Sequence, residues 1–392
     1  MPRVLRIINR YNIGGPTYNA AYLSRFLAPE YETLLIGGRP QPQEAHSGYI
    51  LDQLGVEYRE IGSFGRSLSL IDDYKTFREI RNIIRDFNPD IVHTHAAKAG
   101  ALGRMAAKME KVPVIVHTFH GHVFEGYFNQ WKSSLVQMIE RFLARRSDAI
   151  VAISENQKAD LCQKFRIAPE NKVHIIPLGL DLRKFETDME IKRNLFRKEY
   201  QLEEEILAIG IIGRLTAIKN HELFLNSISE LKKLSRKKII AFIIGDGELK
   251  NELELLCTQL NLNTNDSRDV VFTSWIKDID RAAAGMDIIC LTSINEGTPV
   301  SLIEAQAASR PVVSTFVGGV RDVMLNNASG FIVEEQSAGA IASALYKLTE
   351  NSELRKSMGQ NGHEWANQKF NYTRLVNDMS SLYASLLKNC HA

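Results

Sequence analysis

The sequence has few cysteines and lacks a long apolar run. Its four cysteines, Cys162, Cys257, Cys290 and Cys390, lie far apart and show neither metal-binding nor redox spacing. We therefore expect a reducing compartment and no structural disulfide. No uninterrupted apolar segment is long enough to span a bilayer, and the strand-like start, with its interspersed arginines, is unlike a signal peptide. These absences favour a cytoplasmic protein.

The sequence also lacks dense basic runs, basic motifs interleaved with aromatics, short repeats and low-complexity segments, which disfavours a nucleic-acid partner. Its net charge of +2 is unevenly divided: residues 1–184 carry 25 Lys and Arg against 19 Asp and Glu, and the remainder is net negative. A basic first half suits an anionic partner such as a membrane surface or a phosphate-bearing acceptor. Scattered solvated charges explain the asymmetry equally well.

Strand-like and helical patterns alternate along all 392 residues, a length that favours two domains. The predicted strands are 4–9, 32–36, 56–61, 91–94, 114–117, 149–153, 173–176, 206–212, 239–244, 270–272, 288–291, 312–314 and 331–333. The clearest helical patterns are 20–27, 71–86, 131–145, 223–234, 249–260, 301–308 and 338–348. This order predicts an α/β protein of two doubly wound, Rossmann-like domains, residues 1–180 and 181–371, which bind ligands at the carboxyl ends of their strands.

The most informative stretch is Glu296-Gly-Thr-Pro-Val-Ser-Leu-Ile-Glu304, which follows the predicted strand 288–291. Thr298 followed by Pro299 predicts a capped helix start with proline at the first helical position. Free backbone N–H groups at that start form an anion site, and two carboxylates beside it suit a ligand with hydroxyls near phosphates, such as a nucleotide sugar. The alternative is a surface loop with two solvated glutamates.

Other candidates follow the first strand of each half. Gly213, Arg214 and Lys219 place two cations at the end of strand 206–212, as a diphosphate requires, and the buried strand before Arg214 predicts that this side chain is partly shielded. Gly14-Gly15 allow close backbone approach to a ligand, and Thr17 could cap the next helix, although a plain tight turn is as good an interpretation. Asp278-Ile-Asp280 matches a metal-binding pattern, but capping and first-turn dipole stabilisation explain it better.

Five histidines, His93, His95, His117, His120 and His122, fall within about thirty residues. His93 and His95 share a strand face, and the rest follow on the next strand and its loop. A metal site is one interpretation, polar loop histidines another, and His120 at a strand end suits a sugar hydroxyl or a reacting oxygen. The helix 131–145 carries an apolar stripe with basic residues around it. It could lie on a membrane, but we favour core packing for the stripe.

With these motifs in order, the chain resembles glycosyltransferase family 4, the retaining sugar-nucleotide-dependent transferases of GT-B fold, whose two domains face each other across a cleft. The matching motifs, spread over nearly the whole chain, are Gly14-Gly15, His93-Thr-His95, Thr118-Phe-His120, Gly213-Arg214 with Lys219, Gly245-Asp-Gly-Glu248 and Glu296–Glu304. The last is similar to the family's paired-glutamate motif. The stretch 95–104 with His120-Gly-His122 resembles the bacterial capsule and exopolysaccharide branch.

The resemblance implies a catalytic set of His120, Arg214, Lys219 and Glu296. Arg214 and Lys219 would hold the donor diphosphate and stabilise the leaving nucleotide, Glu296 would contact donor-sugar hydroxyls, and His120 would lie near the reaction centre. It further implies donor contacts from Gly15, Gly213, Gly297, Thr298, Pro299, Val300, Ser301 and Glu304. It implies no metal and no cofactor beyond the nucleotide sugar, and a last helix within 372–392 that packs on the first domain. Pro16-Thr17 depart from many members, which leaves acceptor contacts there open.

We therefore expect a retaining hexosyltransferase, using a donor that is UDP-linked by resemblance. Its acceptor would be a glycan or a polyprenyl-diphosphate-linked glycan for surface polysaccharide, reached from the cytoplasm or from the inner face of an anionic membrane. Retention by two inversions needs a nucleophile near the anomeric carbon. None is evident, so we expect attack from the same face. The alternatives are a GT-B-type sugar-nucleotide epimerase, a non-catalytic nucleotide-sugar-binding subunit and a histidine-based metallohydrolase.

Overall fold

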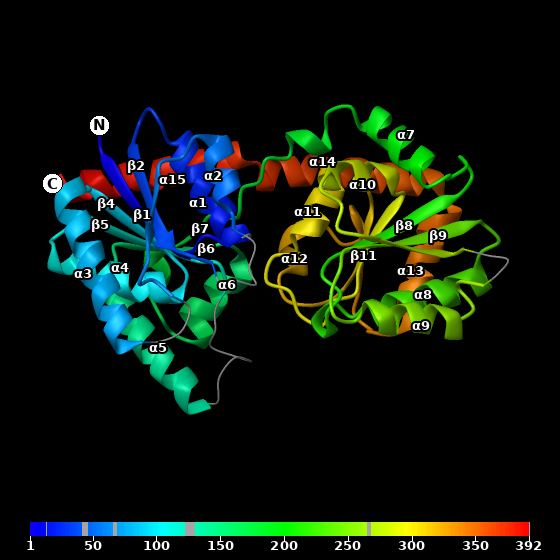
Figure 1. The fold of residues 1–392 in the computed structure, drawn as a ribbon, viewed down its shortest axis with the longest axis horizontal. Coiled ribbons are helices and arrows are strands. Elements are labelled where there is room, and N and C mark those ends of the chain that lie inside the picture. Colours follow the sequence, from blue (N-terminus) through cyan, green and yellow to red (C-terminus); the bar gives the residue numbers. More distant parts are fainter. Residues whose placement is uncertain (13, 41–45, 66–68, 122–129, 265–267, 392) are drawn as a thin grey trace. The chain divides into compact units, whose positions relative to one another are not determined.

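The computed structural model describes residues 1–12, 14–40, 46–65, 69–121, 130–264 and 268–391. The chain divides into two compact units, each described here by itself (Figure 1). Unit 1 comprises Met1–Leu180 and Phe370–Ala392, and unit 2 comprises Asp181–Lys369. Unit 1 thus contains both ends of the chain. None of the described helices combines the length and apolar character needed to cross a bilayer.

Unit 1 is built on a parallel sheet with the strand order β3-β2-β1-β4-β5-β6-β7. Its strands are β1 (Arg3–Arg10), β2 (Glu32–Gly38), β3 (Tyr58–Ile61), β4 (Ile91–His95), β5 (Val114–Phe119), β6 (Ala149–Ala152) and β7 (Val173–Ile175). The order reverses between β1 and β4, so the carboxyl ends of these two strands flank the switch point where doubly wound sheets bind ligands. His95 ends β4, and His120 directly follows β5.

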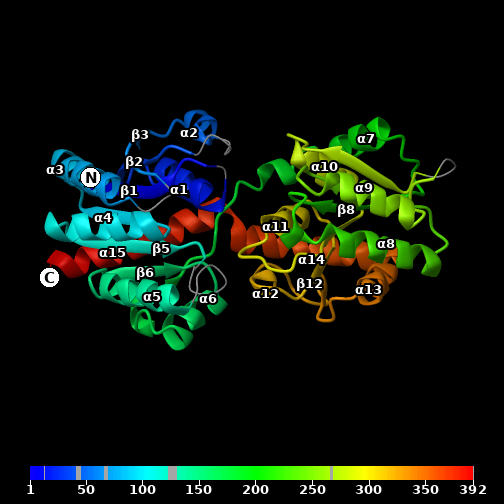
Figure 2. The same cartoon turned by 60° about the horizontal axis from the view of Figure 1, so that its bottom comes forward.

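Helices cover both faces of this sheet. They are α1 (Gly15–Phe26), α2 (Gly48–Leu54), α3 (Leu70–Phe87), α4 (Ala97–Met109), α5 (Gln130–Arg145), α6 (Glu155–Ala159) and α15 (Tyr372–His391). Leu5 and Ile7 of β1 pack with α3 and α4, whereas Val4 packs with α1 and α15. This alternation follows from the two-residue period of a strand. Figures 1 and 2 show α15, in red, running along unit 1.

Unit 2 repeats the plan with the strand order β10-β9-β8-β11-β12-β13, again fully parallel. Its strands are β8 (Leu207–Ile212), β9 (Ile239–Ile244), β10 (Val270–Ser274), β11 (Ile288–Leu291), β12 (Val312–Thr315) and β13 (Gly330–Val333). β8 and β11 flank its switch point. The two most informative sequence motifs, at Gly213 and Glu296, therefore follow neighbouring strands.

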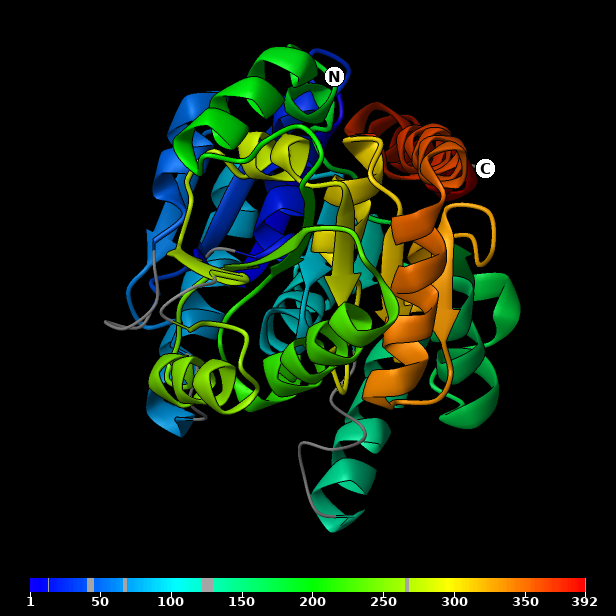
Figure 3. The same cartoon turned by 90° about the vertical axis from the view of Figure 1, so that its right-hand side faces the viewer.

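The helices of unit 2 are α7 (Met189–Glu199), α8 (His221–Leu234), α9 (Lys250–Gln259), α10 (Ile279–Gly285), α11 (Val300–Ala307), α12 (Val320–Val323), α13 (Ala338–Glu350) and α14 (Ser352–Phe370). One apolar core joins α8, α9 and α13 to β8 and β9. Figure 3 shows α8 and α9 on one side of the sheet and α7 and α10 on the other.

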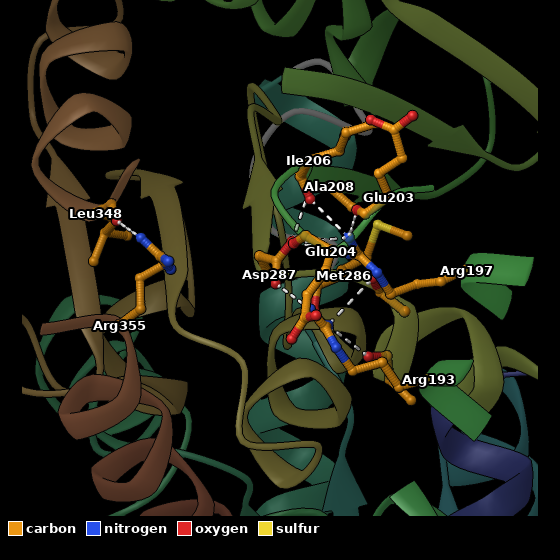
Figure 4. A network of polar contacts seen from close by, with 12 residues as sticks. Arg193, Arg197, Glu203, Glu204, Ile206, Ala208, Met286, Asp287, Leu348 and Arg355 are labelled. Carbon is orange, nitrogen blue, oxygen red and sulfur yellow. Dashed lines mark hydrogen bonds and ion pairs between the residues drawn. The ribbon is translucent and has the colours of Figure 1, made fainter. Parts of the chain in front are cut away.

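At the amino ends of β8 and β11, a network around Asp287 fixes α7 to the sheet (Figure 4). Asp287 accepts hydrogen bonds from Arg193 at 2.7 Å and from the Ala208 amide at 2.8 Å, while Arg197 donates to the Ile206 carbonyl at 2.8 Å. These contacts satisfy otherwise unpaired groups at strand starts. They lie at the sheet edge opposite the Gly213 and Glu296 loops.

The thirteen predicted strands are confirmed within two residues at each end, and so is the two-sheet parallel architecture. The prediction missed α4, because its glycines and alanines give no clear helical period. Gly100 and Gly103 let α4 approach the sheet: a Cβ at Gly100 would lie 2.5 Å from the His117 ring, and one at Gly103 would lie 2.6 Å from Thr94. Local sequence could not reveal this packing requirement.

Candidate active site

The first loop of the candidate site follows β8. The Gly213 amide donates to the Ile244 carbonyl at 3.0 Å, and Gly245, at φ 151°, packs so closely that a Cβ there would lie 2.0 Å from the Gly213 carbonyl oxygen. Gly245 must therefore be glycine. The expected shielding of Arg214 is wrong: its side chain is exposed, because the chain leaves the sheet at Gly213.

The second loop follows β11 and is joined to the first. The Ile294 amide donates to the Ile218 carbonyl at 2.9 Å, and the Thr292 hydroxyl donates to the Asn220 carbonyl at 2.9 Å. On the other side, Thr315 of β12 donates to the Ser293 carbonyl at 2.8 Å. Backbone groups of the Lys219 and Glu296 loops thus hold each other in place at the switch point.

The charged centre of this site is the Glu296 carboxylate. One of its oxygens, Oε1, lies 2.5 Å from Lys219 Nζ and 2.6 Å from the Ser293 hydroxyl, which donates to it. The carboxylate is mostly buried and the ammonium half-buried. Lys219 and Glu296, two of the three predicted catalytic residues of unit 2, are therefore in direct contact. The third, Arg214, is exposed.

Two glycines support the Glu296 loop from behind. Gly318, at φ 44°, lies against Glu296, where a Cβ would come 1.8 Å from the carbonyl oxygen. Gly319 donates its amide to the same carbonyl at 3.2 Å, and a Cβ there would lie 2.0 Å from the Gly297 carbonyl oxygen. Gly318 and Gly319 thus both approach the backbone of the Glu296 loop closely.

The helix after this loop, α11, starts one residue after Pro299, which the start signal predicted as its first residue, and one residue before the helical pattern 301–308. Val300 is its first residue, Pro299 is the extended N-cap residue, and no side chain caps it, so the predicted capping by Thr298 is wrong. Proline at the N-cap already fixes an extended backbone there. Gly297 and Thr298 lie in the loop, and Val300 and Ser301 form the first turn, whose N–H groups have no acceptor within the helix.

Glu304 lies inside α11 and keeps some solvent contact. Burial raises the pKa of its carboxyl to about 7, with a smaller lowering by Lys184 and a smaller raising by Asp280. Asp280 lies in the first turn of α10, and its carboxylate is 2.8 Å from the ammonium of Lys192 on α7. Asp278 is the N-cap residue of α10, but its side chain accepts no capping hydrogen bond, so the predicted capping in Asp278-Ile-Asp280 is wrong. The structure thus places Glu296 in the loop before α11 and Glu304 about one turn into that helix.

Three of the five histidines, His93, His95 and His117, are buried strand residues, so the loop interpretation is wrong for these three. His120 lies in the bend directly after β5, and its Nε2 lies 2.9 Å from His95 Nδ1. Burial lowers the pKa of His120 to about 3 and lowers those of the other three well below the usual value. All four imidazoles are therefore neutral near pH 7. His122 lies outside the described residues.

The tautomer of His93 follows from its partners. Arg6 Nη1 can only donate and lies 2.9 Å from His93 Nδ1, so the proton is on Nε2, which donates to the Thr118 hydroxyl at 2.7 Å. Tyr383 of α15 lies 2.6 Å from the same Nδ1. This ties the last helix to the middle of β4. In the described part of the chain, no three His, Cys, Asp or Glu side chains gather as a metal site would require.

The glycine loop after β1 gives a weaker result. Gly15 is the first residue of α1 and Gly14 its N-cap, while the Thr17 hydroxyl donates back to the Asn12 carbonyl at 2.7 Å, so the predicted capping by Thr17 is wrong. A Cβ at Gly15 would only touch Leu178, at 3.6 Å. Local packing therefore does not demand glycine there, and the close approach of a ligand to Gly15 stays a prediction.

Sequence reasoning missed Ser293, Arg6 and Tyr383. Ser293 could have been considered, since it stands three residues before Glu296 in the sequence. Arg6 and Tyr383 could not, because their contact joins residues 377 positions apart.

Two family models together match most of the chain. Residues 13–184 match the model described as Glycosyltransferase Family 4, and residues 192–365 match the model described as Glycosyl transferases group 1. The "UDP-Gal:alpha-D-GlcNAc-diphosphoundecaprenol alpha-1,3-galactosyltransferase" of Escherichia coli is 28% identical over 347 residues, 88% of this chain and of that protein. The "Capsular polysaccharide biosynthesis glycosyltransferase CapM" of Staphylococcus aureus is 28% identical over 350 residues, 87% of this chain and 88% of CapM.

Solved structures show the same fold. A glycosyltransferase from Rickettsia africae superimposes with a TM-score of 0.81 at 21% identity, covering 99% of both chains. Anabaena HepE in complex with UDP gives 0.82 at 17% identity, covering 98% of this chain and 100% of HepE. These likenesses confirm the predicted GT-B fold.

Proposed function

The chain belongs to the family 4 glycosyltransferases, and on that premise we propose that it transfers a hexosyl group from a nucleotide diphosphate sugar to a glycan or polyprenyl-diphosphate-linked acceptor. The observation that carries the proposal is the joined pair of loops that brings Lys219 and Glu296 into contact beside the start of α11. The names of the Escherichia coli relative and of the HepE complex support a UDP-linked donor, and the former supports a lipid-linked acceptor.

In this proposal the donor diphosphate binds at the carboxyl ends of β8 and β11. The exposed Arg214 and the ammonium of Lys219 neutralise it, and the first-turn N–H groups of α11 donate to it. These two cations neutralise the diphosphate charge that a bound metal ion neutralises in other transferases, so we expect no metal requirement. Glu304, further along α11, accepts from the ribose hydroxyls when ionised.

The chemistry places charge on the departing diphosphate. The bond from the anomeric carbon to the diphosphate oxygen breaks, the acceptor oxygen bonds to that carbon, and the acceptor proton moves to the leaving phosphate oxygen. Glu296 is held by Lys219 and Ser293, which suits hydroxyl binding better than nucleophilic attack. We therefore propose retention by attack from the same face, with Lys219 and Arg214 stabilising the developing charge.

His120 acts as a neutral hydrogen-bonding group in this scheme. Its Nε2 is engaged with His95, and its Nδ1 is buried with no partner among the described residues. An unpaired buried nitrogen costs free energy, so we assign Nδ1 to a hydroxyl of the donor sugar or acceptor. With a pKa lowered by burial to about 3, the ring contributes no positive charge.

The proposed acceptor determines the location that we propose for the enzyme. A polyprenyl diphosphate stays in a bilayer, so we propose a cytoplasmic enzyme that meets its acceptor peripherally at the inner face of an anionic membrane, in capsule or exopolysaccharide synthesis. The basic excess of residues 1–184 supports this location.

A thermal-shift screen of nucleoside diphosphates and their sugars tests donor binding, because a ligand that binds the folded state raises the melting temperature. We expect UDP and one UDP-hexose to stabilise the protein, in EDTA as in buffer. The stabilising donor is then incubated with and without a polyprenyl-diphosphate glycan. Acceptor-dependent glycan supports the proposal. A new nucleotide sugar formed without acceptor would identify an epimerase instead, and binding without any turnover would identify a binding subunit.

A further inference from the structure

Two imidazoles of unit 1, from neighbouring strands, share one short contact. His95 is the last residue of β4, and His120 follows β5, which runs parallel to β4 with Thr118 opposite His95. Nδ1 of His95 lies 2.9 Å from Nε2 of His120, and the two rings are inclined by 23°. His95 is fully enclosed, whereas the His120 residue keeps some exposure. A ligand can therefore reach His120 more easily than it can reach His95.

Among the described residues, His120 is the one hydrogen-bonding partner of the His95 side chain. The His95 ring stacks on His93, with 4.3 Å between the ring centres, but both nitrogens of His93 are already engaged. Nε2 of His95 is buried with no partner in the described part of the chain. By contrast, Nδ1 of the buried His117 lies 2.8 Å from the hydroxyl of Thr94. The contact with His120 is therefore the polar function that the imidazole of His95 supplies.

The protons of this pair can be counted. Because burial lowers both pKa values, both rings are neutral near pH 7, and each carries one proton. If His95 donates from Nδ1, its Nε2 is bare, and His120 must keep its own proton on Nδ1. If His120 donates from Nε2, its Nδ1 is bare, and the proton of His95 lies on Nε2. The tautomer of His95 thus decides whether Nδ1 of His120 donates or accepts.

The enclosed Nε2 of His95 distinguishes the two arrangements. A hydroxyl can serve Nδ1 of His120 in either one, because a hydroxyl both donates and accepts. Nε2 of His95 has no such partner among the described residues. In protein backbones, a buried N–H without an acceptor is rarer than a buried carbonyl that lacks a donor, and we apply the same order to the ring nitrogens. The arrangement with a bare Nε2 on His95 therefore costs less free energy.

We infer that His95 is a positioning residue: it donates from Nδ1 to His120 and so fixes His120 as the tautomer that donates from its own Nδ1. His120 then recognises a hydroxyl oxygen that accepts, on the donor sugar or on the acceptor glycan. A neutral N–H orients such a hydroxyl without attracting the anionic diphosphate, which Arg214 and Lys219 bind in the proposed function. The role in transfer rests on the proposed function, but the tautomer does not.

Nuclear magnetic resonance of the full chain, labelled with ¹⁵N-histidine, reads the tautomers directly, because protonated and bare ring nitrogens differ widely in shift. The signals of His120 are assigned by their loss in His120→Gln. Near pH 7 the unchanged protein should show a proton on Nδ1 of His120 and a bare Nε2 on His95. His117→Leu, which removes a buried histidine that forms no hydrogen bond with His120, should keep this tautomer. A proton on Nε2 of His120 would overturn the inference.

Transfer assays test the consequence for the reaction. His95→Leu should lower kcat by roughly tenfold or more, as the loss of one oriented hydrogen bond implies. His95→Asn should recover most of this loss, because its amide can donate at the place of the imidazole Nδ1. His117→Leu, the matched buried control, should be less stable but transfer at the normal rate. UDP should bind His95→Leu normally. Weaker binding of the UDP-hexose would place the recognised hydroxyl on the donor, and a higher KM for the glycan would place it on the acceptor.

The outcomes separate this inference from the proposed function. A kcat within twofold of normal in His95→Leu would overturn the inference and leave the proposed function standing. Equal losses of kcat in His95→Leu and His117→Leu would show a packing role and would also overturn it. If the unchanged protein transfers nothing, the proposed function fails, and the tautomer of His120 alone decides whether His95 positions it. The same measurement decides the inference if His95→Leu does not fold.

Discussion

Lys219 Nζ lies 2.5 Å from Oε1 of Glu296, although the two residues are 77 positions apart and lie on loops after different strands. In this state the lysine charge is neutralised within the protein. In the proposed function, an incoming diphosphate would compete with Glu296 for Lys219, and the donor-sugar hydroxyls would take the place of the lysine at the carboxylate.

The first prediction concerns Lys219 itself. Lys219→Ala should lower kcat by roughly 10²- to 10³-fold, because it removes a cation at the place where charge develops on the leaving diphosphate. Lys233→Ala is the control: Lys233 is an exposed lysine of unit 2 on α8, paired with Glu230 at 2.7 Å, and its loss should leave kcat unchanged. Turnover within twofold of normal in Lys219→Ala would refute the assignment.

Glu296→Gln should separate binding from turnover. The glutamine removes the negative charge that competes for Lys219, so titration calorimetry should show tighter binding of UDP, by several-fold. The same change should lower kcat by at least tenfold, because the amide accepts more weakly from the donor-sugar hydroxyls. Glu335→Gln, at an exposed glutamate of unit 2, should change neither quantity. Weaker UDP binding by Glu296→Gln would contradict the competition.

The strands and the places of the two loops that carry Arg214 and Glu296 could be predicted, because buried parallel strands are continuous apolar runs and each loop follows such a run. Contacts between residues far apart in the sequence could not be predicted. The loop joining through Thr292 and Asn220, and the contact of Arg6 with Tyr383, depend on which strands become neighbours. Of the apolar stripe on α5 that core packing was expected to bury, only Leu143 is buried. Trp131, Leu135, Met138, Ile139 and Phe142 are exposed, and this could not be predicted, since a stripe of the same period serves either a core or a surface.

Gly319→Ala tests whether the Glu296 loop needs its support. The added methyl would lie 2.0 Å from the Gly297 carbonyl oxygen, so we expect a loss of about 1–3 kcal/mol in unfolding free energy and a lower kcat as Glu296 moves. Gly339→Ala is the matched control in the first turn of α13. Its Cβ meets nothing within 4 Å, and helix propensity predicts a gain of up to about 1 kcal/mol. Equal stability of the two variants, measured by denaturant unfolding, would contradict the packing role.

Glu304 should make donor binding depend on pH. With its pKa raised by burial to about 7, the carboxyl is mostly protonated at pH 6 and mostly ionised at pH 8. If the carboxylate accepts from the ribose, affinity for a nucleotide sugar should rise about tenfold over that range. Glu304→Gln should bind with an affinity that does not vary with pH. A nucleotide sugar is the right probe because its diphosphate does not titrate there.

The same pKa sets the sign of a stability effect. The folded pKa of Glu304 lies above the unfolded value of 4.5, so the folded state holds the proton more tightly. The contribution of Glu304 to stability is therefore full below pH 4.5 and is lost as pH rises through about 7. Relative to the unchanged protein, Glu304→Gln should be more stable at pH 8 than at pH 4.5. A difference that does not change with pH would show that the carboxyl is solvated.

The buried histidines of unit 1 make the stability depend on pH in the opposite direction. Burial lowers the folded pKa values of His93, His95, His117 and His120 below 6.5, so their neutral forms stabilise the fold above pH 6.5 and that stability is lost as pH falls. Each histidine contributes up to about 1.4 kcal/mol per pH unit in that window. Four together amount to at most roughly 6 kcal/mol per pH unit, comparable with the whole stability of a domain.

Unit 1 should therefore unfold before unit 2 on acidification, between about pH 4 and 5.5 if its stability is typical of a domain. Among the described residues of unit 2, His221 is the comparable histidine, with a pKa lowered by burial to about 4, and Glu304 acts in the other sense. Hydrogen exchange of the full chain, followed by mass spectrometry over a pH series, resolves the two units. Earlier loss of protection in unit 2, or a simultaneous loss in both, would contradict a neutral histidine cluster, because a cluster already charged at pH 6 has no further protons to take up.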